Sequence, residues 1–199
     1  MGPGLVVIGT SWGGLHALNT ILAGIPADFG FPIIAVQHRS KDSGETMAEY
    51  LQESCRLKVT EAEDKDPILP GHVYIAPPDY HLLVDGESLA LSTDEQINYS
   101  RPSIDLLFET AAESYGRGVV GVVLTGANHD GSRGAQRIKE LGGTVLVQDP
   151  LSAESAAMPE SAIATVKVDG ILPLEKISGA LVELAQKNGL QKREKRDGA

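Results

Sequence analysis

A serine flanked by glycines follows the first apolar run of the chain. Residues 5–8 (LVVI) lead into residues 9–13 (GTSWG), which have the pattern G-x-S-x-G, and a helical pattern follows. In a strand–turn–helix setting this tight turn raises the serine hydroxyl above the sheet. It also puts Ser11 at a helix N-terminus, where backbone N–H groups such as that of Trp12 can stabilise an oxyanion. Ser11 is therefore a candidate nucleophile. The alternative is a glycine turn that only packs a helix on a strand.

Two more polar side chains follow other apolar runs. His38 ends the second run, and Asp130 lies in the polar loop after the third. The carboxyl ends of parallel strands share one edge of a sheet, so we expect these side chains to meet Ser11 there. An imidazole can act as general base, and a carboxylate can orient it. His129 is the rival base, and Asp130 could instead serve turn chemistry. The chain order Ser, His, Asp disfavours an ordinary α/β-hydrolase.

The same glycine turn also resembles a nucleotide-binding loop. Gly9-x-Ser11-x-x-Gly14 is a degenerate form of the dinucleotide pattern G-x-G-x-x-G. Ser11 stands where the second glycine belongs, and His38 stands where an acidic residue would hold a ribose. The next two residues, an arginine and a serine, could instead meet a 2′-phosphate. A NADP-dependent oxidoreductase is therefore an alternative hypothesis.

These residues need a scaffold, and the unbroken apolar runs are typical of strands buried on both faces. Strands are predicted at residues 5–8, 32–36, 118–124, 144–147 and 162–168. Helices are predicted at residues 15–22, from residue 43, and at residues 102–115, 132–141 and 174–184. Residues 60–71 are predicted to form a loop, and residues 72–92 an antiparallel flap or sheet edge that turns at Asp85-Gly86. The predicted fold is α/β, a doubly wound, mostly parallel sheet with helices on both faces and an inserted antiparallel β-hairpin.

Composition excludes several classes of protein. The chain has 199 residues, with 17 Lys and Arg against 27 Asp and Glu, a net charge of −10 that disfavours nucleic-acid binding. The single cysteine and the absence of a signal-like start favour a cytoplasmic protein, and no apolar run is long enough to span a membrane. We predict one domain over residues 1–186 and a polar, basic C-terminal tail over residues 187–199.

Five segments together resemble the catalytic domain of the CheB family, the chemotaxis protein-glutamate methylesterases. They run in order along nearly the whole chain, and in combination they are highly specific. The segments are VIGTSWGG at 7–14, VQH at 36–38, GHVYIAPP at 71–78, RPSIDLLF at 101–108 and LTGANHDG at 124–131.

The resemblance implies a role for each candidate residue. Ser11 is implied as the nucleophile, His38 as the general base and Asp130 as its orienting carboxylate. The implied reaction is hydrolysis of glutamate γ-methyl esters, and deamidation of glutamines, on the cytoplasmic helices of chemoreceptors. No cofactor and no metal is implied. A separate receiver protein or a methyltransferase is a further candidate partner.

The chain departs from the family pattern in three ways. Trp12 stands where the family usually has Thr, and Ala127 where it usually has Met, so both can reshape the pocket. No receiver domain precedes the matching residues, which leaves either a standalone enzyme or a piece of a longer chain. A catalytically silent receptor-binding module, with Trp12 filling the pocket, therefore remains an alternative to the hydrolase.

Overall fold

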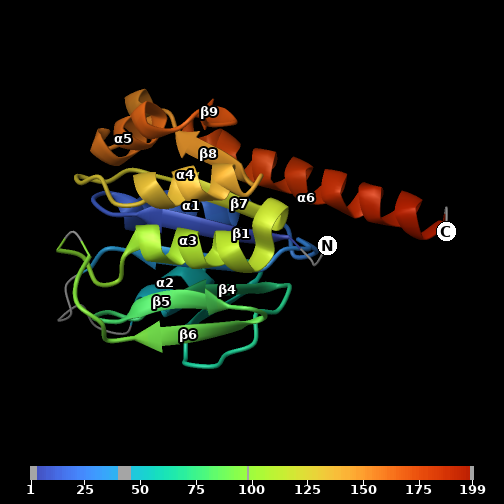
Figure 1. Cartoon of the computed structure of the whole chain (residues 1–199), viewed down its shortest axis with the longest axis horizontal. Coiled ribbons are helices and arrows are strands. Elements are labelled where there is room, and N and C mark those ends of the chain that lie inside the picture. The colour runs from blue at the N-terminus through green and yellow to red at the C-terminus, as the bar shows by residue number, and fades with distance from the viewer. Residues whose placement is uncertain (1–3, 40–45, 98, 198–199) are drawn as a thin grey trace.

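A computed structural model describes residues 4–39, 46–97 and 99–197 of the chain (Figure 1). In these ranges the strands are β1 (Leu5–Thr10), β2 (Ile33–Gln37), β3 (Lys58–Glu61), β4 (His72–Ile75), β5 (His81–Asp85), β6 (Ser88–Ser92), β7 (Val119–Val123), β8 (Thr144–Gln148) and β9 (Gly170–Leu172). The helices are α1 (Gly14–Ala23), α2 (Thr46–Gln52), α3 (Ile104–Tyr115), α4 (Ser132–Glu140), α5 (Ala157–Thr165) and α6 (Leu174–Asp197).

Seven strands form one parallel sheet, and the other two form a hairpin. The order in the sheet is β3-β4-β2-β1-β7-β8-β9, and β5 pairs antiparallel with β6. The order reverses direction at β1, so β1 lies between β2 and β7 in the centre of the sheet. The predicted doubly wound α/β fold with an inserted hairpin is confirmed.

Two apolar layers cover the sheet, because alternate residues of each strand point to opposite faces. In β1, Val6 and Ile8 pack with α1, α2 and α6, whereas Leu5 and Val7 pack with α3, α4, α5 and the hairpin. Figure 1 shows the hairpin lying on the side of α3 away from α4. Among the described residues, no helix is both long and apolar enough to cross a bilayer.

Three predicted segments differ from the structure. The predicted loop at residues 60–71 begins too early, because residues 60–61 belong to the edge strand β3. Residues 72–75 belong to the parallel sheet as β4 rather than to the flap. Residues 162–168 were expected as a strand, yet most of them end helix α5, and the strand at this edge is β9. Short apolar runs with β-branched residues occur in strands and in helices alike, and periodicity alone does not distinguish the two.

The last helix is longer than the periodicity predicts. α6 continues without a break to Asp197, and Figure 1 shows its end extending away from the rest of the molecule. Residues 187–197 of the predicted tail are thus helical, and the division at residue 187 stays a prediction. The expected helix start at residues 43–45 lies outside the described residues.

Candidate active site

Ser11 follows β1 directly, at the carboxyl edge of the sheet. Its backbone N–H donates to the carbonyl of Thr125 at 2.9 Å, and its carbonyl accepts from Gly14 at 2.9 Å and from Nε2 of Gln37 at 2.7 Å. Gly13, the N-cap of α1, has φ of 77°, which favours glycine. Within the described part of the chain, the Ser11 hydroxyl has no hydrogen-bond partner. The backbone of the turn is fixed and the hydroxyl is left available.

His38 and Asp130 meet although 92 residues separate them. Nε2 of His38 lies 2.8 Å from Oδ2 of Asp130, and the side chains are 13% and 1% exposed. His38 follows β2 and its N–H donates to the carbonyl of Thr10, while Asp130 precedes α4. The structure thus brings these two residues into contact. Among the described residues no hydrogen bond joins Ser11 to His38, so the catalytic roles of the three residues stay a prediction.

Asp130 receives three further donors from the start of α3. The N–H groups of Ile104 and Asp105 donate to it at 2.7 and 2.9 Å, and the hydroxyl of Ser103 donates at 3.1 Å. Burial raises the pKa of the Asp130 carboxyl, but the hydrogen bonds from His38 and from these backbone groups outweigh burial, and the pKa lies below its ordinary value. Asp130 is therefore a carboxylate that can hold a positively charged imidazole.

Asn128 contacts the other nitrogen of the His38 ring. Its Nδ2 lies 3.1 Å from Nδ1, while its Oδ1 accepts the N–H of Asp130 at 3.1 Å and so fixes the orientation of the amide. Because Nε2 donates to the carboxylate, Nδ1 carries the lone pair that can take a proton. Asn128 was not among the predicted site residues. The rival base His129 is exposed, and no described hydrogen bond joins its ring to Ser11 or Asp130.

Ser11 and His38 line the same hollow. Its volume is about 400 Å³, and its wall also includes Trp12, Leu15, His16, Gln37 and Ala127. Trp12 is 66% exposed, so its ring does not fill the hollow as a buried side chain would. His38 also lines a second hollow of about 390 Å³, together with Arg39, Asp79, Gln96, Tyr99, Ser100 and Arg101. His38 therefore borders two open spaces.

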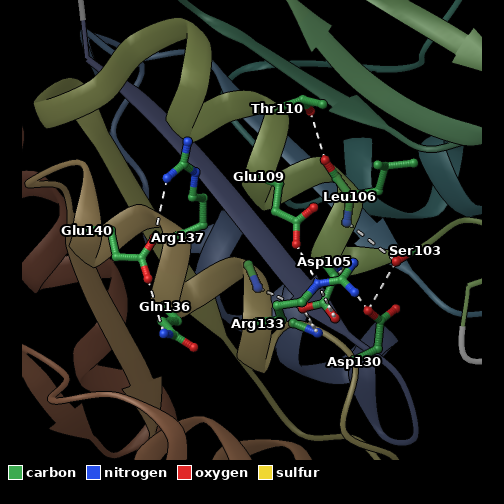
Figure 2. Close-up of polar contacts among 12 residues, drawn as sticks. Ser103, Asp105, Leu106, Glu109, Thr110, Asp130, Arg133, Gln136, Arg137 and Glu140 are labelled. Carbon is green, nitrogen blue, oxygen red and sulfur yellow. Dashed lines mark hydrogen bonds and ion pairs between the residues drawn. The ribbon is translucent and has the colours of Figure 1, made fainter.

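Two further supporting residues were not predicted. Gln37 donates through Nε2 to the carbonyls of both Ser11 and His38, which links the two turns through one amide. Asp105 lies beside Asp130 between α3 and α4, as Figure 2 shows. Both residues belong to segments that carried the family resemblance, VQH and RPSIDLLF, and their position in those segments was the available signal.

Comparisons with known proteins agree on one family. Residues 6–181 match the family model described as CheB methylesterase. A putative protein-glutamate methylesterase/protein-glutamine glutaminase of Leptospira interrogans is 50% identical over 184 residues, covering 92% of this chain and 95% of the relative. A protein-glutamate methylesterase/protein-glutamine glutaminase of Thermotoga maritima is 38% identical over 184 residues, but the match covers only 54% of it. The crystal structure of the Thermotoga maritima CheB methylesterase catalytic domain matches with a TM-score of 0.88 and 37% identity, over 92% of this chain and all of that one.

Proposed function

Because this chain belongs to the CheB methylesterase family, we propose that it hydrolyses glutamate γ-methyl esters, and deamidates glutamines, on the cytoplasmic helices of chemoreceptors. Ser11 is the proposed nucleophile, His38 the general base and Asp130 the carboxylate that orients it. The observation that carries the proposal is the 2.8 Å contact between His38 and Asp130 beside the hollow that Ser11 lines. We infer a cytoplasmic location from the substrate helices.

The proposed reaction has two steps. The Ser11 hydroxyl attacks the ester carbonyl and its proton passes to Nδ1 of His38, where it has to replace the contact with Asn128. The imidazolium, held by Asp130, then protonates the leaving methoxide, and methanol departs from the acyl-enzyme. Water, activated by His38, adds to the acyl carbon and releases glutamate and the serine. With a glutamine substrate the leaving group is ammonia.

The attack of Ser11 on the ester carbonyl forms an oxyanion, and the N-terminus of α1 can stabilise its negative charge. Among the described residues, the backbone N–H of Trp12 has no hydrogen-bond partner, so it is available to an oxyanion formed over Ser11. Trp12 and Ala127 line the hollow with Ser11, and so their side chains contact the group that carries the ester. We propose that these two residues set the fit of the substrate.

The test compares methanol release from methylated receptor membranes by wild type and by Ser11→Ala. We expect kcat to fall by about 10⁶-fold, because members of a triad act as a unit. A serine-reactive phosphonate should label wild type and not the variant. Ser178→Ala is the matched control, since Ser178 lies on α6 and lines neither hollow, and it should keep both methanol release and labelling. A folded wild type with neither turnover nor labelling would contradict the proposal and favour a silent receptor-binding module.

A further inference from the structure

The start of α4 lacks a cap of its own. Its N-cap is Gly131, which has φ of 98° and no side chain to accept the free N–H groups of the first turn. Oδ1 of Asp105 accepts them instead, at 2.9 Å from the N–H of Gly131 and 2.8 Å from that of Gly134. Asp105 comes from the first turn of α3, so one helix supplies the cap of the other.

The capping is reciprocal. Asp130 accepts the N–H groups of Ile104 and Asp105 at the start of α3, and Asp105 accepts that of Gly131, the residue after Asp130, at the start of α4. Each carboxylate therefore holds the segment that carries the other. Each also lies at a helix N-terminus, where the helix dipole favours negative charge.

The packing leaves little room for another arrangement. Asp105 and Asp130 are each 2% exposed, so water cannot replace the N–H groups that they bind. A Cβ on Gly134 would lie 2.5 Å from Cβ of Phe108 and 2.9 Å from the carbonyl oxygen of Asp105. α3 and α4 are thus in close contact where the two carboxylates cap them.

We propose that Asp105 is a positioning residue for the reaction: by capping α4 it fixes the loop that presents Asp130, and so fixes the carboxylate against His38. The inference rests on the proposed function, because it assigns Asp105 a part in the same reaction. Nε of Arg133, a mostly exposed side chain, lies 4.0 Å from Oδ2 of Asp105 and 2.6 Å from Oε1 of Glu109 (Figure 2).

The test measures kcat per active site, with the sites titrated by a serine-reactive phosphonate. Asp105→Ala should lower kcat by about 100-fold and change KM by less than about threefold, because a small displacement of the catalytic group slows the chemical step. Asp105→Asn keeps an oxygen for both glycine N–H groups but loses the charge, so kcat should fall by about 10-fold. Glu109→Gln removes a carboxylate one turn along α3, without contact to Asp130, and should leave kcat unchanged.

A residue that only stabilised the fold would reduce the number of titratable sites and not the rate at each site. A second readout needs no substrate: the downfield proton resonance of the His38 Nε2–H, which the bond to Asp130 produces, should shift or broaden in both Asp105 variants and not in Glu109→Gln. If Asp105→Ala does not fold, Asp105→Asn decides the question. Wild-type kcat per site, or an unchanged resonance, in a folded Asp105 variant would overturn the inference. A wild type that releases no methanol would overturn the proposed function alone.

Discussion

Ser11 is held through its backbone, whereas Asp130 is held through its side chain. Three hydrogen bonds fix the N–H and carbonyl of Ser11, and its hydroxyl has no partner among the described residues. The oxygens of Asp130 accept from one imidazole, one hydroxyl and two backbone N–H groups. The hydroxyl of Ser11, the proposed nucleophile, can therefore rotate to meet a substrate, whereas the carboxylate of Asp130 cannot move without breaking buried hydrogen bonds. Substitutions near Ser11 should act through space and packing, and substitutions near Asp130 through charge and hydrogen bonds.

Among substitutions around Asp130, the largest effect is expected for Asp130→Asn. An amide must turn its NH₂ toward at least one of the N–H donors that surround both oxygens, and it removes the charge that stabilises the imidazolium. We expect kcat on methylated receptor to fall by about 10⁴-fold, the scale seen when a triad carboxylate becomes an amide. The unsatisfied buried donor should also cost about 1–3 kcal/mol of unfolding free energy.

Asp85→Asn is the control for this substitution, because Asp85 is exposed on the hairpin. It should change neither kcat nor the free energy of unfolding. A loss of less than tenfold in Asp130→Asn would contradict this prediction, because neither the charge nor the complete set of hydrogen bonds at Asp130 would then be needed for the reaction.

A smaller effect on kcat is expected near Ser11, from Gly14→Ala. The added Cβ would lie 1.9 Å from Oε1 of Gln37 and 2.4 Å from Oγ1 of Thr10, so the Gln37 amide would have to leave the carbonyls of Ser11 and His38. Overpacking of this kind costs about 1–3 kcal/mol. Displacement of the two turns should lower kcat by about 10- to 100-fold, measured as methanol release per titrated site.

Gly30→Ala provides the comparison, since a Cβ there meets nothing within 4 Å. Its thermal unfolding and kcat should match those of wild type. If Gly14→Ala also kept wild-type kcat, the link between the Ser11 and His38 turns through Gln37 would be unnecessary for the reaction.

The parts of the fold that the sequence predicted are those with one strong local signal. β1, β2, β7 and β8 are fully or almost fully buried, so their apolar runs are unbroken. β3 has a single buried residue, Val59, and as a short edge strand it shows no clear alternation. Charges and prolines around it therefore indicated a loop.

The candidate site also has a part that local sequence signals predict and a part that they do not. The placement of Ser11, His38 and Asp130 could be predicted because each follows a strand, and the carboxyl ends of parallel strands share one edge of the sheet; their catalytic roles stay a prediction. Asp105 and Asn128 could not, because their roles depend on contacts with residues 25 to 90 positions away. Asp105 occurs in the first turn of an amphipathic helix, where an acidic residue needs no further explanation.

The smallest expected effect is on the pH dependence of the unfolding free energy, to which Asp105 and Asp130 should contribute with opposite signs. Hydrogen bonds place the pKa of Asp130 below the ordinary 3.8, whereas burial, with the charge of Asp130 as a further cause, raises that of Asp105 above it. Asp130 thus stabilises the fold at pH values above 3.8, and this stabilisation is lost as the pH falls through its lower folded pKa. Asp105 contributes with the opposite sign. Its buried, ionised carboxyl destabilises the fold at neutral pH, and this destabilisation decreases as the pH falls through the raised folded pKa toward 3.8.

Urea unfolding at several pH values, followed by circular dichroism, separates the two contributions. As the pH falls from 7 toward about 4, wild type should gain stability relative to Asp105→Asn, by about 1.4 kcal/mol for each unit by which the folded pKa exceeds the unfolded one. Relative to Asp130→Asn, wild type should keep its advantage over that range and lose it only at lower pH. If both differences moved in the same direction, the two carboxylates would be sharing a proton, and the helix caps would act as one titrating group rather than two opposed ones.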